Sequence, residues 1–320
     1  MTVPLTDATV PLEDALSKGE QIWFDGKLVP AAEAKVSVLT HALHYGTSVF
    51  EGIRAYATAR GPAVFRLPEH TERLLDSAKI LGMPVPYSAE EISGAVLETV
   101  RASGLESCYI RPLVWYGADS LGVHPASNPV HFMVAAMPWG HYLGEAAVRE
   151  GAKLMTSSWR RSPGDVMPTK AKAGGNYINS VLANKEAKEA GFDEALLLDK
   201  EGFVAEGSGE NIFFFKGGTL YPIAHSVNLR GITRDSVVKL AQSLGIPVVP
   251  TMATRDELYI ADEVFMVGTA AEVTPVSYLD RRAIGSGKAG ELTLKLREAY
   301  LQAAAGKLPE FEHWLTHVKG

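Results

Sequence analysis

Two charged residues stand in glycine-rich stretches that suit one kind of organic chemistry. Lys172 is followed by Ala-Gly-Gly-Asn-Tyr, and Glu206 is followed by Gly-Ser-Gly-Glu-Asn. A lysine amine forms a Schiff base with an aldehyde when its surroundings disfavour its positive charge, as small apolar neighbours do. A carboxylate in turn pairs with the ring nitrogen of a pyridinium. Together the two residues predict a site for pyridoxal 5'-phosphate (PLP).

Two later segments add groups that suit a phosphate. Leu229–Arg234 and Gly268–Glu272 each offer backbone N–H groups and a threonine hydroxyl, and such groups commonly bind phosphate oxygens. Each segment alone has an ordinary alternative, because glycine-flanked lysines are common in solvated loops and Thr233 also suits a helix cap. Four such segments in order favour a single phosphate-bearing cofactor.

Two more stretches, His41–Arg54 and Tyr109–Leu113, extend the pattern toward the N-terminus. With them, the chain from Gln21 to about Gly290 resembles the branched-chain amino-acid aminotransferases of the class IV PLP-dependent family. The resemblance implies an α+β fold of two domains. A small mixed α/β domain would be followed by a larger β-rich domain with helices, and the cofactor would lie at the domain interface.

The resemblance also implies roles for individual residues around the cofactor. Lys172 would form the Schiff base and move protons, Tyr177 would hydrogen-bond the ring hydroxyl, and Glu206 would partner the ring nitrogen. The phosphate would be bound by Arg73, Leu229, Ile232, Thr233 and Thr269. Composition alone describes Arg73 as a solvated helix charge and Tyr177 as a core residue. Lys170 and Glu210 are the competing lysine and acid, which we interpret as solvated and structural.

The substrate residues follow from the same resemblance. The apolar wall would comprise Phe50, Tyr45, Val123 and Tyr142, and the α-carboxylate would bind the backbone at Thr269 and Ala270. Tyr109 and Arg111 would capture the side-chain carboxylate of glutamate, which arginine binds through two hydrogen bonds. Tyr45 and Val123 would come from a neighbouring subunit, so the resemblance implies a homo-oligomer that is at least a dimer, with a trimer of dimers left open.

The expected activity is transfer of the amino group of L-leucine, L-isoleucine or L-valine to 2-oxoglutarate in a ping-pong cycle. A D-amino-acid or (R)-amine transaminase, or an aminodeoxychorismate lyase, would keep the fold and cofactor. Tyr109–Pro112 and Gly122–Pro125 favour the branched-chain type. A PLP-binding carrier without turnover is the third possibility.

Bulk properties agree with an enzyme that acts on small molecules. The 320 residues suffice for two domains, and 46% apolar with 21% charged residues is ordinary for a globular protein. No apolar run suggests a membrane span, and the net charge of −6 without a basic block argues against nucleic acid. A single cysteine, Cys108, and a first segment resembling no targeting signal predict a cytoplasmic protein. We predict no metal site, because His41 and His44 lack further ligands at familiar spacing.

Local patterns place these residues on elements. An Asp-Gly hairpin is expected within Gln21–Val29, and Ser88 to Glu91 reads as a capping box. Helices are predicted over 69–82, 88–103, 176–190, 233–244 and 290–304, and strands over 109–116, 131–136, 153–158, 195–199, 203–204, 211–215 and 219–222. We expect a loosely ordered extension over 1–20, a small domain over 21–136, a linker over 137–146 and a large PLP-binding domain over 147–320.

Overall fold

The computed structural model describes residues 21–125, 127–140, 144–224 and 227–318. Their contacts divide the chain into two compact units. The N-terminal unit holds the chain up to Trp139, Lys170–Ile178 and the residues from Gln302 onward, and the C-terminal unit holds Gly140–Thr169 and Asn179–Leu301. The predicted extension over 1–20 lies outside the described residues. The predicted domain limits at 136 and 147 stay a prediction.

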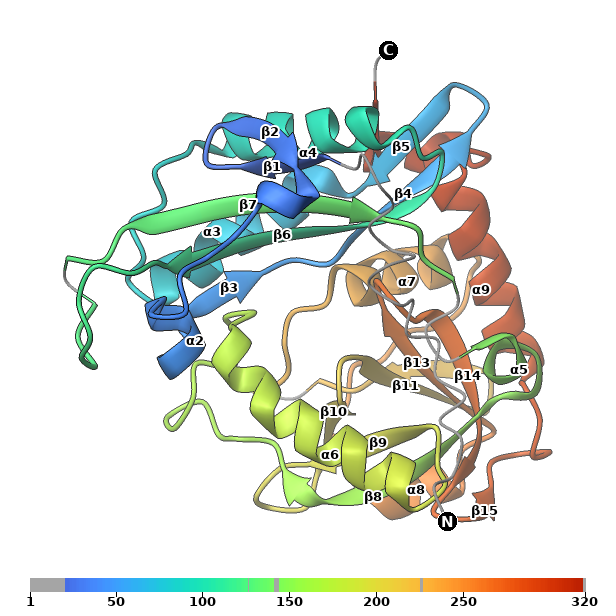
Figure 1. Ribbon diagram of the computed structural model, residues 1–320. Coiled ribbons are helices and arrows are strands. Elements are labelled where there is room, and N and C mark those ends of the chain that lie inside the picture. The colour runs from blue at the N-terminus through green and yellow to red at the C-terminus, as the bar shows by residue number, and fades with distance from the viewer. Residues whose placement is uncertain (1–20, 126, 141–143, 225–226, 319–320) are drawn as a thin grey trace. The chain divides into compact units, whose positions relative to one another are not determined.

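An antiparallel sheet forms the framework of the N-terminal unit (Figure 1). Its strand order is β16-β5-β4-β6-β7-β1-β2, and β3 pairs with β6. The strands are β1 (Gln21–Phe24), β2 (Lys27–Pro30), β3 (Ser48–Phe50), β4 (Ile53–Thr58), β5 (Gly61–Phe65), β6 (Cys108–Tyr116), β7 (Val130–Met137) and β16 (Leu315–His317).

Local sequence signals explain the predicted elements of this unit. The β1–β2 hairpin turns at Asp25 and Gly26, whose φ angles of 45° and 99° are those that Asp-Gly tolerates. Helix α4 (Ala89–Ser103) begins with the predicted capping box of Ser88 and Glu91. It ends at Gly104, which is left-handed with φ 65°. The hairpin and the capping box are therefore confirmed.

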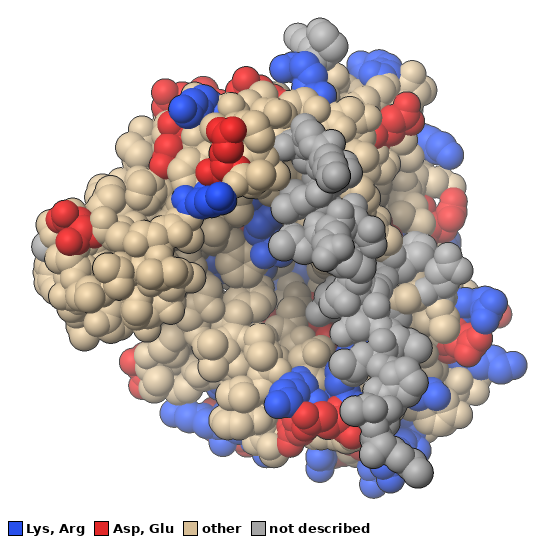
Figure 2. Space-filling model, viewed as in Figure 1, with Lys and Arg blue, Asp and Glu red and all other residues tan. Residues whose placement is uncertain are grey.

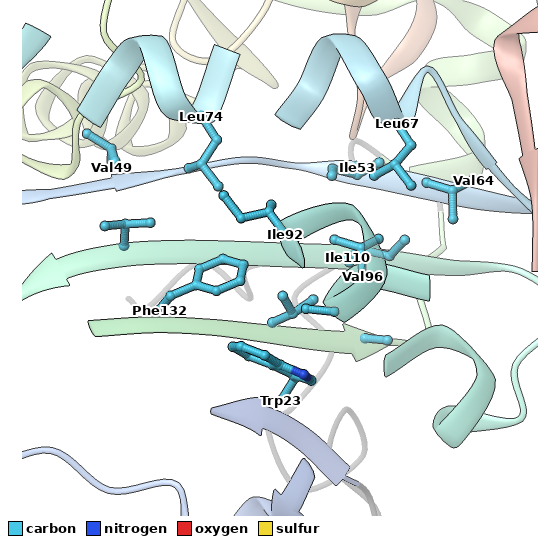
Figure 3. Packing of buried hydrophobic residues seen from close by; sticks show 14 of the residues in the cluster. Trp23, Val49, Ile53, Val64, Leu67, Leu74, Ile92, Val96, Ile110 and Phe132 are labelled. Atoms are coloured by element: carbon cyan, nitrogen blue, oxygen red, sulfur yellow. The ribbon is translucent and has the colours of Figure 1, made fainter. Parts of the chain in front are cut away.

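Helices α3 (Leu67–Ile80) and α4 cover the sheet and close its core. Leu74 of α3 and Ile92 of α4 are fully buried with Ile110 and Phe132 of the strands (Figure 3). Trp23 of β1 joins them, with its ring centroid 5.3 Å from that of Phe132. Burying each large apolar side chain contributes roughly 1.5–3 kcal/mol, so this core fixes where α3 and the strand ends lie.

Shorter elements complete the N-terminal unit: η1 (Ala31–Glu33), α2 (His41–Tyr45), η2 (Gly174–Asn176) and η3 (Pro309–Trp314). The last of these leads into β16, which pairs with β5. Trp314 is 2% exposed and packs on Phe65 and Phe311. The C-terminal segment is thus part of the core.

The C-terminal unit has its own sheet, in the order β10-β9-β8-β14-β13-β11-β12, with β15 beside β14. Strand β8 runs parallel to both β9 and β14, and the other pairs are antiparallel. The strands are β8 (Ala152–Arg160), β9 (Glu194–Leu198), β10 (Val204–Gly207), β11 (Asn211–Lys216), β12 (Thr219–Pro222), β13 (Glu263–Gly268), β14 (Glu272–Leu279) and β15 (Arg282–Ala283).

Helices pack against this second sheet: α5 (Gly144–Glu150), α6 (Tyr177–Glu189), α7 (Ile232–Ser243), α8 (Arg255–Tyr259) and α9 (Glu291–Ala304). Ala183 and Ala187 of α6 are buried with Leu197 of β9. Every strand and helix predicted from the sequence is present within a few residues. Strands β3, β4, β5, β13 and β14 were not predicted.

Lys, Arg, Asp and Glu are interspersed over the face shown in Figure 2, without a basic block. An almost uncharged surface covers α2 and the β6–β7 loop, where Val38, Leu43, Leu121 and Val123 are exposed. In the part of the chain that the structure describes, no helix is both long and apolar enough to span a bilayer.

Candidate active site

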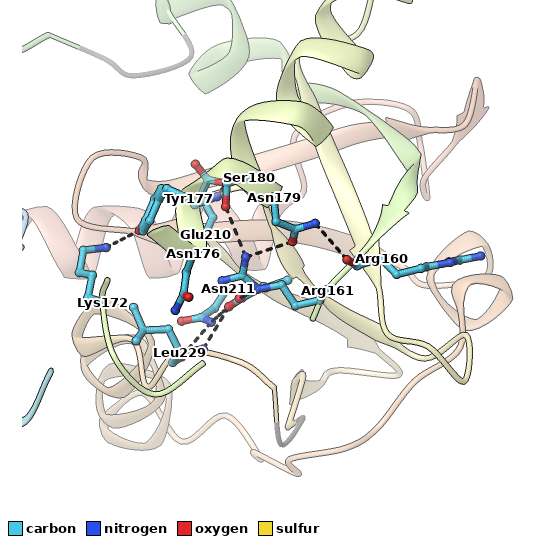
Figure 4. Close-up of polar contacts among 12 residues, drawn as sticks. Arg160, Arg161, Lys172, Asn176, Tyr177, Asn179, Ser180, Glu210, Asn211 and Leu229 are labelled. Carbon is cyan, nitrogen blue, oxygen red and sulfur yellow. Dashed lines mark hydrogen bonds and ion pairs between the residues drawn. The ribbon is translucent and has the colours of Figure 1, made fainter. Parts of the chain in front are cut away.

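Lys172 lies in a short segment of the N-terminal unit that is fixed by its main chain. Its N–H donates to Ser77 Oγ at 3.0 Å, and its carbonyl accepts from the Phe50 N–H at 3.0 Å. The side chain is half-buried, with Nζ 2.6 Å from the Tyr177 hydroxyl (Figure 4). Nζ also lies 4.9 Å from the centroid of the Phe50 ring. The amine therefore sits beside a phenol and an aromatic face rather than in bulk water.

A buried ionic cluster stands next to this segment. Glu51, which directly follows β3, is fully buried and accepts from Arg73 Nε and Nη2, each at 2.7 Å. It also lies 2.7 Å from His70 Nδ1. Burial opposes ionisation of Glu51, but the Arg73 charge and the hydrogen bonds from Arg73 and His70 outweigh it, so its pKa lies well below the usual range. Burial lowers the pKa of His70 and keeps it neutral.

The residues expected to bind glutamate lie together on β6. Arg111 Nη2 donates to the Tyr109 hydroxyl at 3.0 Å, and its guanidinium lies 4.7 Å from the Phe50 ring centroid. The buried Arg111 Nε has no hydrogen-bond partner among the described residues. Trp139 stacks on Tyr109, with centroids 4.6 Å apart. A buried guanidinium with an unused donor suits a carboxylate ligand.

Two of the predicted substrate residues are exposed. Tyr45 on α2 is 44% exposed and Val123 in the β6–β7 loop is 82% exposed. His41 joins their segments, because its ring nitrogens lie 2.7 Å from Thr47 Oγ1 and 2.9 Å from the Gly122 carbonyl. The predicted contact Tyr142 lies outside the described residues.

Glu206 is held in the C-terminal unit by three groups. Its Oε1 lies 2.7 Å from Arg161 Nε, and both side chains are nearly buried, at 6% and 11% exposure. Its Oε2 accepts from the Leu229 N–H at 3.2 Å and from Asn211 Nδ2 at 3.4 Å. Arg161 also donates weakly to Asn179 and Ser180 (Figure 4). A carboxylate so oriented suits a protonated ring nitrogen.

The start of helix α7 offers the predicted phosphate donors. The helix begins at Ile232, its N-cap is Gly231, and no side chain among the described residues caps it. The capping alternative for Thr233 is therefore wrong, because Thr233 lies inside the first turn. A Cβ at Gly231 would collide with the side chain of Asn211. Uncapped first-turn N–H groups and the positive end of the helix dipole suit an anion.

Thr269 and Ala270 are half-buried in the turn between β13 and β14. The competing residues behave as interpreted: Lys170 is exposed, and buried Glu210 accepts from the Gly209 N–H. Burial raises the pKa of the Cys108 thiol to about 12, which fits an inert core residue.

The chain belongs to the amino-transferase class IV family, whose profile matches residues 48–279. The family resemblance and the α+β fold class inferred from the sequence are thereby confirmed.

Close relatives carry one more specific name. The chain is 50% identical to the branched-chain-amino-acid aminotransferase of Pseudomonas aeruginosa over 298 residues, covering 93% of this chain and 97% of the relative. It is 46% identical to the enzyme of that name from Escherichia coli strain K12 over 303 residues, covering 94% and 98%. A crystal structure of an Escherichia coli branched-chain amino acid aminotransferase superimposes with a TM-score of 0.92 and 46% identity, covering 94% of this chain and 100% of that chain.

A further solved structure holds a form of the expected cofactor. It is the crystal structure of a branched-chain amino acid aminotransferase with pyridoxamine 5'-phosphate, from the source abbreviated T.th. in its description. It superimposes with a TM-score of 0.92 and 62% identity, covering 94% of this chain and 99% of that chain.

The residues present fit a PLP cofactor. An amine beside a phenol, an oriented carboxylate and an uncapped helix start match its aldehyde, ring and phosphate. Sequence reasoning missed Glu51, His70 and Arg161. Glu51 had a usable signal, because a lone acid inside the apolar run Val49 to Ile53 must be paired when buried.

Proposed function

We propose that this protein is a PLP-dependent transaminase that transfers the amino group of L-leucine, L-isoleucine or L-valine to 2-oxoglutarate. The products are the branched-chain 2-oxo acids and L-glutamate. The observation that carries the proposal is the 2.6 Å contact between Lys172 Nζ and the Tyr177 hydroxyl. The relatives named above support the substrate class.

PLP supplies an aldehyde for the amino group and a ring that accepts electron density. Lys172 binds the aldehyde and, once released by the substrate amine, moves the proton at the substrate α-carbon. Tyr177 holds the Lys172 amine and donates to the ring hydroxyl. Glu206 keeps the ring nitrogen protonated, with Arg161 orienting its carboxylate.

The phosphate is assigned to the start of α7 and to two further groups. Leu229, Ile232, Thr233 and Thr269 supply N–H and hydroxyl donors, and Arg73 supplies a cation. The uncapped first turn of α7 supports this assignment.

One substrate site serves two kinds of side chain. Phe50 and Tyr142, with Tyr45 and Val123 of a second copy, form the apolar wall, while Tyr109 and Arg111 bind the glutamate carboxylate. The backbone at Thr269 and Ala270 binds the α-carboxylate. The exposure of Tyr45 and Val123 supports a homodimer as the working unit, since large apolar surface usually marks an interface. We place the protein in the cytoplasm.

Turnover of each L-amino acid with 2-oxoglutarate, followed as glutamate formed, tests the proposal. Lys172→Ala should show no turnover, whereas Lys170→Ala should retain it, because Lys170 is exposed. Turnover of D-leucine or an (R)-amine in place of L-leucine would move the protein to another activity of the class.

A further inference from the structure

The carboxylate of Glu51 links the two segments that surround Lys172. Glu51 follows Phe50 directly, and the Phe50 N–H binds the Lys172 carbonyl. On the other side, Glu51 binds His70 and Arg73 of helix α3. Ser77 of the same helix accepts from the Lys172 N–H. All these contacts lie inside the N-terminal unit.

Helix geometry explains why one carboxylate serves several residues. His70, Arg73 and Ser77 are spaced three and four apart, so they share one face of α3. That face meets Glu51 and the main chain of Lys172. A shift of α3 would therefore displace Arg73 and the Lys172 segment together.

Glu51 also sets the orientation of the Arg73 guanidinium. Both carboxylate oxygens are used, one on Nε and one on Nη2, each at 2.7 Å. This two-point contact fixes the plane of the guanidinium and engages one edge of its five N–H groups. A second anion approaches another edge. Arg73 faces the active-site phenols, since Tyr177 and Tyr109 act on its charge.

The burial of this carboxylate suggests a purpose beyond packing. Glu51 is fully buried, and a buried ion pair is often no more stable than apolar side chains of the same volume. What the pair provides is direction, because a fixed guanidinium loses little entropy when an anion binds.

We infer that Glu51 is a positioning residue for the cofactor phosphate, acting through Arg73. The inference rests on the proposed function and adds a residue that does not itself contact the cofactor. It predicts that Glu51 matters for the phosphate and not for the aldehyde or the ring.

The experiment compares the affinity of the apo-protein for PLP and for pyridoxal, which lacks the phosphate. In Glu51→Gln, the ratio of the two affinities should fall about tenfold, the factor for one lost hydrogen bond to a charged group. Ser77→Ala is the matched control, because it touches the Lys172 main chain and not Arg73. It should weaken both ligands equally and leave the ratio unchanged.

A ratio that stays at the wild-type value in Glu51→Gln overturns the inference and leaves Glu51 structural. If Glu51→Gln does not fold, Glu51→Asp keeps the charge but is too short for the same two-point contact, and the same fall in ratio is expected. Failure of the proposed function itself would look different, because the wild-type protein would then bind PLP no more tightly than pyridoxal.

Discussion

Removing the cation beside Glu206 should destabilise the protein far more than removing a surface ion pair. Arg161→Met leaves the carboxylate 6% exposed without its guanidinium. Breaking a buried pair from one side costs about 3–5 kcal/mol. The other hydrogen bonds to Glu206 described above are long, at 3.2 and 3.4 Å, and compensate little. We expect a loss of about 3 kcal/mol or more in the free energy of unfolding.

A double-mutant cycle separates the pair from other effects of the substitution. Arg161→Met combined with Glu206→Gln removes both charges, so the double variant should be more stable than the sum of the single losses predicts. The expected coupling is about 2 kcal/mol, as for residues in direct contact. The control pair, Asp235 and Lys239, is 44% and 47% exposed. Its loss should cost about 0.3–0.5 kcal/mol.

Urea unfolding of the apo-protein, followed by far-ultraviolet circular dichroism, measures these differences. A loss in Arg161→Met no larger than in the control pair, or strictly additive losses in the double variant, would refute the reasoning.

Three further changes have defined outcomes. Arg111→Ala should lower kcat/KM for glutamate about 10–100-fold more than for leucine, because a charged hydrogen bond contributes about 1.5–3 kcal/mol; equal losses in steady-state kinetics would remove Arg111 from the carboxylate site. Trp314→Ala should cost about 3–5 kcal/mol, measured by thermal unfolding, whereas Trp159→Ala, at 45% exposure, should cost under about 1 kcal/mol. Because the pKa of Glu51 is depressed in the folded protein, its stabilisation is present above its ordinary value of 4.5 and is lost as pH falls below it. Wild-type Tm should therefore fall more steeply between about pH 5 and 3 than that of Glu51→Gln, and parallel curves would contradict this.

The sequence predicted those elements whose signals are local. The hairpin at Asp25 and Gly26 and the cap at Ser88 depend on residues a few positions apart. Strand β16 depends instead on pairing with β5, which lies far earlier in the chain, so the C-terminal segment carried no local sign of its burial.

The same limit applied to the site. Lys172, Tyr177 and Glu206 stand in motifs that could be read directly. Arg161 gave no such sign, because its partner Glu206 lies on another strand. Likewise, Arg73 was predicted from a resemblance, while its pairing with Glu51 required the packing of α3 on the sheet.

The absorption spectrum of the PLP-loaded protein before and after adding L-leucine alone tests the central claim most directly. The account predicts that the band of the lysine-bound cofactor disappears, that a pyridoxamine-like band takes its place, and that 2-oxoglutarate restores the first band. A lysine-bound band that L-leucine leaves unchanged would contradict the proposed activity.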